Sequence, residues 1–182
     1  MVVRAKAGDR AALNALLERH LVTVYRFVAV KMGAAHPDLD DIVQEALIGA
    51  SRSIRGLRGE TNIEVAGWLL SITRHKVADH LRAAYSRPHE SLAGPDAKKL
   101  TDPAPPVDEL VESRDRAERL RSALREVTPE QEEVLTLRFV LGFSLNEVAQ
   151  ITRRPVGAVK SMQHRALASL HQRLSPEEAA WS

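Results

Sequence analysis

The sequence predicts an all-α protein made of two small helical domains joined by a flexible linker, with a helix-turn-helix in the C-terminal domain. Of the 182 residues, 44% are hydrophobic but only 4% are aromatic, which leaves little material for a β-sandwich. Apolar residues recur at helical spacing on both sides of a central segment. That segment, residues 86–106, is proline-rich and holds few large apolar residues, and the longer stretch over residues 86–113 carries six acidic residues against three basic ones. We therefore expect it to be a linker without a core of its own.

Composition excludes several classes of protein. The chain has no cysteine, which removes disulfides, cysteine-based zinc sites and a thiol nucleophile. No apolar run approaches the roughly 18 residues of a membrane span, and residues 1–10 lack a signal-peptide core. We expect a soluble, cytoplasmic protein without membrane contact of its own. The net charge is only +2, so any binding to nucleic acid must depend on local patches.

The N-terminal domain is predicted over residues 1–85, and its first helix over residues 11–31. Gly33 and Pro37 end this helix. The apolar stripe at helical spacing consists of Leu13, Leu16, Leu17, Leu21, Val24, Phe27 and Val28.

Residues 38–54 are predicted to form the next helix. Acidic residues occupy its first turn, where the helix dipole favours negative charge. The side chains expected to face inward are Leu39, Ile42, Val43, Ala46, Leu47 and Ala50.

A loop over residues 55–62, with Gly56 and Gly59, separates this helix from one over residues 64–85. The inward side chains of that helix are expected to be Val65, Trp68, Leu69, Ile72, Val77 and Leu81. Since Trp68 lies on this stripe, we expect it in the core and not as a stacking platform for bases.

The C-terminal domain is predicted over residues 107–182, with its first helix over residues 107–126. Thr128 and Pro129 then stand at the N-cap and first position of a helix over residues 129–141. Gly142 ends that helix, and residues 175–182 are expected to fray.

The stretch from Ser144 to Arg165 is the most informative part of the chain. Ser144 and Glu147 occupy the two polar positions of a capping box. Pro155 disfavours helical geometry at the residue before it, so the first helix must end there. A second helix then begins, with Val156, Val159 and Leu167 on its apolar side. This pattern is typical of a helix-turn-helix, whose second helix enters the major groove of DNA.

The second helix carries charge of one sign, because residues 152–174 contain basic residues and no Asp or Glu. A one-sign stripe beside a turn indicates a surface for a polyanion, although a helical hairpin with a solvated basic face would give the same pattern. The residues that we expect at the DNA are Arg153, Arg154, Val156, Lys160, Ser161, Gln163, His164 and Arg165.

Three segments carry a family resemblance. Residues 38–46 (DLDDIVQEA) resemble the core-binding helix of bacterial RNA polymerase sigma factors, and residues 68–82 look like the promoter-reading helix that follows it. Residues 124–174 are similar to the C-terminal DNA-binding domain of these proteins. The order, the spacing and the short linker resemble the extracytoplasmic-function (ECF) group.

The resemblance implies an alternative sigma factor, a transcription initiation factor that binds core RNA polymerase and directs it to specific promoters. The N-terminal domain would dock on the largest catalytic subunits through Asp38, Asp40, Asp41, Val43, Gln44, Glu45 and Leu47. It would also open the minus-ten element with Arg55, Arg58, Thr61, Asn62, Arg74, His75, Lys76 and Arg82. The C-terminal domain would read the minus-thirty-five element as duplex. No cofactor or metal is implied, whereas an anti-sigma protein is an expected partner, because many members of the group have one and this chain has no obvious sensor.

The proposed minus-ten surface suits its task, since holding unstacked bases requires base-edge hydrogen bonds and backbone cations. The chain also departs from the family pattern at three positions. His75 stands where Asn is usual, Ser51 where Trp is common, and Met162 where an Arg would supply a phosphate contact. These departures bear on individual contacts and not on the fold.

Three other functions are open to test from sequence. A free-standing helix-turn-helix regulator would not need the helix of residues 38–45, and it would usually dimerise. An enzyme is disfavoured, because no phosphate loop, nucleophile elbow or His-Glu-x-x-His motif occurs, and His75 and His80 are not at the spacing of a helical metal pair. A helical adaptor without DNA binding does not explain the one-sign stripe.

Overall fold

A computed structural model describes residues 1–86 and 127–174, and within these ranges the chain forms only helices and the turns between them. The N-terminal domain contains α1 (Val2–Lys6), α2 (Arg10–Met32), α3 (Leu39–Ser53), the short 3-10 helix η1 (Ile54–Gly56) and α4 (Asn62–Ser86). The C-terminal domain contains α6 (Pro129–Leu135), the π-helical segment η2 (Thr136–Val140), α7 (Leu145–Thr152) and α8 (Val156–Leu174). The predicted linker and the predicted helix over residues 107–126 lie outside the described residues.

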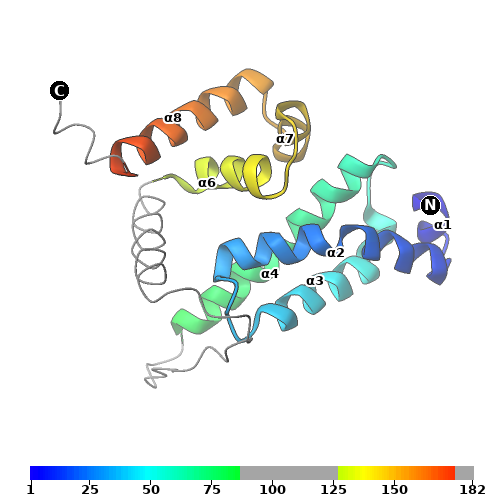
Figure 1. Ribbon diagram of the computed structural model, residues 1–182. Coiled ribbons are helices and arrows are strands. Elements are labelled where there is room, and N and C mark those ends of the chain that lie inside the picture. Colours follow the sequence, from blue (N-terminus) through cyan, green and yellow to red (C-terminus); the bar gives the residue numbers. More distant parts are fainter. Residues whose placement is uncertain (87–126, 175–182) are drawn as a thin grey trace, which may run out of the picture.

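In the N-terminal domain α2, α3 and α4 lie alongside one another and enclose a core (Figure 1). Val28 of α2, Ala46 of α3 and Val65 of α4 are all buried within it. One predicted core residue is wrong: Leu21 is 41% exposed, and His20 is buried in its place. The buried positions of α2 advance by four residues at a time over this stretch, which places His20 on the inner face and turns Leu21 outward.

The short helix α1 was not expected from the polar composition of residues 1–10. Val2 and Ala5 are nevertheless buried against the core of the domain. Arg4 forms an ion pair of 2.7 Å with Asp9, the N-cap residue of α2, and so joins the two helices. Five residues are too few to show a helical period, so the sequence alone gives no signal for this element.

The helix predicted to start at Thr128 and Pro129 begins at these residues in the structure. The Thr128 hydroxyl accepts a hydrogen bond from the Gln131 amide, and the Gln131 side chain accepts one from the Thr128 amide, which completes a capping box. The expected helix over residues 129–141 widens after Leu135, where the amide of Leu141 donates to the carbonyl of Thr136, five residues earlier.

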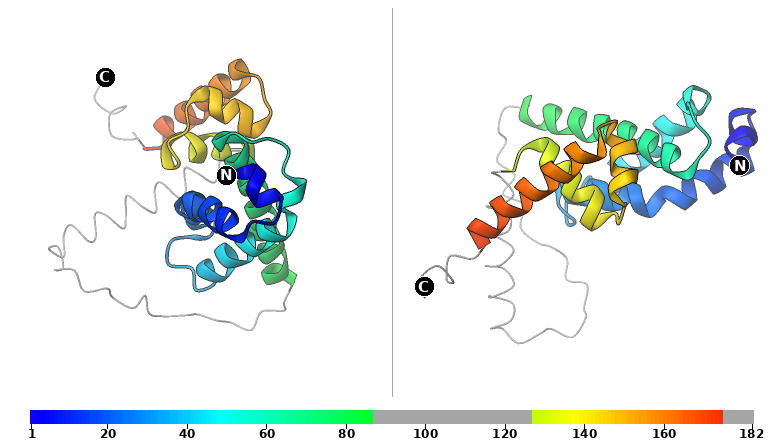
Figure 2. Two further views of the ribbon diagram at one scale, coloured as in Figure 1. Left: turned by 90° about the vertical axis from the view of Figure 1, so that its right-hand side faces the viewer. Right: turned by 90° about the horizontal axis from the view of Figure 1, so that it is seen from above.

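The two domains pack directly against each other, with α6 and α7 over α2 and α4 (Figures 1 and 2). Their shared apolar cluster includes Phe27, Leu70, Val134, Leu137, Val148 and Val159. Phe27 and Leu70 come from the N-terminal domain and are completely buried. None of the helices within residues 1–86 and 127–174 combines the length and apolar character that a bilayer crossing requires.

Candidate nucleic-acid interface

The helix-turn-helix forms as predicted, and it is fixed by its caps. The Ser144 hydroxyl accepts a hydrogen bond from the Glu147 amide at 3.3 Å, and the Glu147 carboxylate accepts one from the Ser144 amide at 2.7 Å. The hydrogen bond from the Ser144 amide to the carboxylate, followed by a contribution from the Ser144 side chain, lowers the pKa of Glu147 because both stabilise its charged form. The amides of Ser144 and Glu147 at the start of α7 therefore both have hydrogen-bond acceptors.

The turn between α7 and α8 is built on Arg153, which adopts a left-handed backbone with φ of 54°. The Arg154 amide then donates to the Ala149 carbonyl at 3.0 Å and closes the helix end. Pro155 precedes α8, and its carbonyl accepts hydrogen bonds from Ala158 and Val159. The turn uses an arginine where a glycine is common, and the Arg153 side chain is exposed at the surface.

The predicted DNA-facing residues of this motif mostly lie at the surface. The exposed ones are Arg153, Arg154, Val156, Lys160, Ser161, His164 and Arg165. Gln163 is half-buried, and its amide oxygen accepts a hydrogen bond from Arg138 at 3.1 Å. The outer face of α8 thus keeps Lys160 and Arg165 free of any salt bridge among the described residues.

The apolar side of α8 differs from the expectation. Val156 and Leu167 are 42% and 40% exposed, whereas Met162 is 6% exposed and lies in the core shared by the domains. Met162 follows the buried Val159 by three residues and precedes the buried Ala166 by four, which is the period of one helix face. This position therefore serves packing, and the sulfur also lies 3.7 Å from the Arg154 guanidinium.

Two buried residues anchor the predicted minus-ten loop to the core of the N-terminal domain. Ile54 and Leu57 are buried, while Arg55 and Arg58 beside them are exposed. Each arginine thus follows directly after an anchored residue. The loop therefore holds both arginines at the surface, with the buried Leu57 between them.

The end of this loop is tied to α4 by a carboxylate. The Glu64 carboxylate accepts hydrogen bonds from the amides of Glu60 and Thr61, each at 3.0 Å, and from the Thr61 hydroxyl at 2.7 Å. These bonds, chiefly those from Thr61, lower the pKa of Glu64. Gly59 has φ of 123°, and a Cβ there would come within 2.5 Å of that carboxylate, so glycine is required. Thr61 and Asn62 remain exposed.

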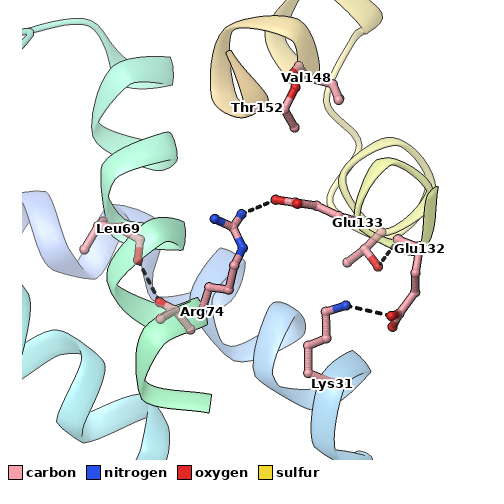
Figure 3. Close-up of polar contacts among 9 residues, drawn as sticks. Lys31, Leu69, Arg74, Glu132, Glu133, Val148 and Thr152 are labelled. Carbon is pink, nitrogen blue, oxygen red and sulfur yellow. Dashed lines mark hydrogen bonds and ion pairs between the residues drawn. The ribbon is translucent and has the colours of Figure 1, made fainter. Parts of the chain in front are cut away.

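The predicted minus-ten residues on α4 have different surroundings. His75 is exposed, Arg82 pairs with Asp79 at 3.1 Å, and Lys76 pairs with Glu45 of α3 at 3.2 Å. Arg74 instead reaches across to Glu133 of α6 in the other domain (Figure 3). Arg74 is therefore engaged within the protein in this arrangement.

The predicted polymerase-facing helix, α3, presents a continuous outer face. Its exposed polar residues are Asp40, Asp41, Gln44 and Glu45, and Asp38 and Leu47 are half-buried. Val43 is only 6% exposed and belongs to the core, so it has little surface to offer a partner. Ile48, which sequence reasoning missed, is 40% exposed on the same helix.

A cleft of about 1190 Å³ lies between the two domains and brings together both predicted DNA surfaces. Its lining includes Arg58 and Arg74 from the N-terminal domain and Arg153 and Arg154 from the turn of the helix-turn-helix. Beside it, Lys31 of α2 pairs with Glu132 of α6 at 2.9 Å (Figure 3). Residues predicted to read two separate DNA elements thus line one cleft, which the sequence could not indicate.

Comparison with known proteins identifies both domains. Residues 16–87 match the family model for sigma-70 region 2, and residues 117–170 match that for sigma-70 region 4. The chain is 34% identical to the ECF RNA polymerase sigma factor BldN of Streptomyces coelicolor, over 98% of this chain and 66% of that protein. It is 33% identical to the ECF RNA polymerase sigma factor SigD of Mycobacterium tuberculosis, over 99% of this chain and 83% of that protein.

Two solved structures share the fold. The chain is similar to CnrH in complex with the cytosolic domain of CnrY, with a TM-score of 0.64, 22% identity, and coverage of 97% of this chain and 96% of that one. It is also similar to the sigma factor RpoE of Bartonella quintana in complex with the anti-sigma factor NepR, with a TM-score of 0.57, 22% identity, and coverage of 88% and 95%.

Proposed function

Because this chain belongs to the ECF group of RNA polymerase sigma factors, which direct the polymerase to promoters, we propose that α3 is its polymerase-binding surface and α8 its minus-thirty-five reader. The N-terminal loop of residues 55–62 and the outer face of α4 hold the minus-ten element. The assignments of Asp41 and Gln44 to the polymerase, and of Lys160 and Arg165 to duplex DNA, rest on their exposure and charge.

The observation that carries the proposal is the outer face of α3. It is acidic and solvent-exposed, and it presents Ile48 among its charges, with Glu45 paired to Lys76 of α4 at one edge. A free-standing regulator needs only the helix-turn-helix, so this second surface distinguishes the sigma factor from that alternative. Its acidic character suits a basic docking surface on the polymerase.

The two domains must separate when the protein reads a promoter. The minus-ten and minus-thirty-five elements are roughly 25 base pairs apart, which corresponds to about 85 Å along B-DNA at 3.4 Å per base pair. In the described arrangement Arg74 and Arg154 instead line the same cleft. We therefore take the packed arrangement as a closed form that does not read both elements together.

An anti-sigma protein is a fitting partner for the closed form. The B. quintana relative was solved with its anti-sigma factor, and CnrH with the cytosolic domain of CnrY. In this chain the packed domains already engage Arg74 in an ion pair with Glu133. A protein bound across both domains would stabilise that state by mass action.

Co-elution with core RNA polymerase on size exclusion tests the polymerase surface. Asp41→Arg places a cation in the acidic face of α3. We expect it to lower the affinity for core polymerase, measured by co-elution, at least about tenfold, which is within the range that a like-charge contact costs at an interface. Glu18→Arg, an equal charge change at an exposed position of α2, is the matched control. Equal co-elution of both variants and the parent protein would place the polymerase surface elsewhere.

A further inference from the structure

A compact cluster of potential metal ligands lies at the start of α3, outside the proposed DNA surfaces. His36 and Asp38 come from the connection between α2 and α3, and His80 comes from the C-terminal part of α4. One ligand atom from each residue lies within 4.8 Å of the other two. All three side chains are half-buried, so each is held by its surroundings yet open to solvent on one side.

The cluster is held by backbone structure on both sides. The His36 amide donates to the Gly33 carbonyl at 3.2 Å, and the Leu39 amide donates to the His36 carbonyl at 3.1 Å, which fixes the turn before α3. Leu39 is buried in the core. His80 lies three residues after the buried Val77, on a helix packed along α3. The three donors are therefore positioned before any ion arrives.

Asp38 has an unusual role for its position. It is the N-cap residue of α3, yet its carboxylate makes no capping hydrogen bond to that helix. Its Oδ2 lies instead 3.3 Å from Nε2 of His80. An aspartate at this position normally caps the helix, whereas here the carboxylate is directed toward His80.

The separation between His80 and Asp38 suits a tetrahedral ion. Metal–ligand bonds of about 2.0–2.1 Å in tetrahedral geometry separate two ligands by about 3.3 Å, which is the separation of His80 Nε2 and Asp38 Oδ2. The rings of His36 and His80 stand nearly perpendicular, at 84°, with centroids 5.7 Å apart. Two rings can therefore converge on one ion without stacking.

His36 offers an unprotonated nitrogen. Its Nδ1 accepts a hydrogen bond from the Asp38 amide at 3.2 Å, which requires a lone pair on that atom. A metal ion bound at Nδ1 would take the place of this hydrogen bond. His80 can likewise present the nitrogen that now faces Asp38.

We propose that His36, Asp38 and His80 form a binding site for a divalent transition metal of the zinc class, with solvent completing the coordination. Two imidazoles with one carboxylate suit Zn²⁺, Co²⁺ or Ni²⁺, whereas Mg²⁺ and Ca²⁺ take oxygen ligands. The ion would brace the first turn of α3 against α4. The metal site does not depend on the proposed function, although Asp38 is also one of the residues expected at the polymerase.

Titration calorimetry of the full-length, tag-free chain with ZnCl₂ tests the site, with Co²⁺ absorption as a second readout. We expect one ion per chain, a visible spectrum typical of tetrahedral Co²⁺, and a rise in melting temperature with Zn²⁺ concentration. MgCl₂ should give no saturable heat. Failure to bind Zn²⁺ at one site with a Kd below about 100 μM, equivalent to about 5.5 kcal/mol, would overturn the proposal.

The ligands are tested one at a time. His80→Ala and His36→Ala should each weaken Zn²⁺ binding at least about tenfold. If either alanine variant fails to fold by circular dichroism, Asp38→Asn, which keeps the size of the side chain, replaces it in the test. Asp38→Asn should weaken Zn²⁺ binding to the same extent. His171→Ala, at an exposed position of α8, is the matched control and should bind normally. Unchanged affinity in the cluster variants, or equal loss in the control, would place the ion elsewhere.

Discussion

The ion pair between Lys31 and Glu132 joins the two domains, so substitutions at these residues test how the domains pack. The pair spans 2.9 Å, and its side chains are 20% and 32% exposed, so water screens it only in part. We predict that Glu132→Lys shifts the protein from the closed form toward separated domains. The double variant Lys31→Glu with Glu132→Lys restores the pair with its charges exchanged, and it should return the protein to the closed form.

The size of the shift follows from the loss of one ion pair and the gain of one repulsion. A partly exposed pair stabilises by up to about 1 kcal/mol, and like charges at the same distance cost a similar amount. The total is about 1–2 kcal/mol, which changes the ratio of closed to open protein by a factor of roughly five to thirty. The apolar cluster around Phe27 and Leu70 is left intact, so each domain should keep its fold.

Energy transfer between two dyes measures the shift. The chain has no cysteine, so Ala11→Cys on α2 and Ala168→Cys on α8 provide unique labelling sites at exposed positions. In a urea titration, Glu132→Lys should lower the midpoint at which transfer is lost, and the double variant should restore it. An unchanged midpoint in Glu132→Lys, or no recovery in the double variant, would refute the role of this pair.

Three further outcomes test the caps, the DNA surface and the buried histidine. Ser144→Ala removes the N-cap of α7 and should lower the free energy of unfolding by about 0.5–2 kcal/mol in urea, whereas Ser161→Ala should change it little, and equal effects would contradict the cap. Lys160→Ala should reduce the salt dependence of duplex binding by about one phosphate contact, and an unaltered slope in filter binding would mean that this side chain does not touch the backbone. The pKa of His20 lies below its ordinary value of 6.5, chiefly because burial disfavours its charged form. The unfolded chain therefore takes up a proton first, and stability falls as pH drops through about 6.5 toward the folded pKa. His20→Leu should reduce the loss of unfolding free energy between pH 7.5 and 5.5, and an equal loss in both proteins would exclude His20 as the cause.

Much of the fold could be predicted because local signals agreed with the tertiary structure. The caps at Thr128 and Ser144 and the apolar stripes of α3 and α4 are properties of short windows of sequence. The interface between the domains could not be predicted in the same way. Phe27 and Leu70 are apolar whichever partner covers them, and only the assembled structure shows that the C-terminal domain does so.

The residues of the candidate surfaces also fall into those that local sequence predicts and those that only the assembled structure brings together. Exposure of Lys160 and Arg165 follows from the helical period and was predicted. The capture of Arg74 by Glu133 and the meeting of His36 with His80 join residues far apart in the chain, and no local pattern encodes such contacts. Met162 shows the converse: the sequence indicates only the loss of a phosphate contact, whereas its burial shows that the position serves packing.

Run-off transcription with bacterial core RNA polymerase on a pool of promoters tests the central claim most directly. We predict specific transcripts that appear only when the protein is added, with start sites that define both promoter elements, and their loss with Asp41→Arg. No transcripts and no stable complex with the polymerase, together with sequence-specific binding to duplex DNA, would contradict the account and identify a free-standing regulator instead.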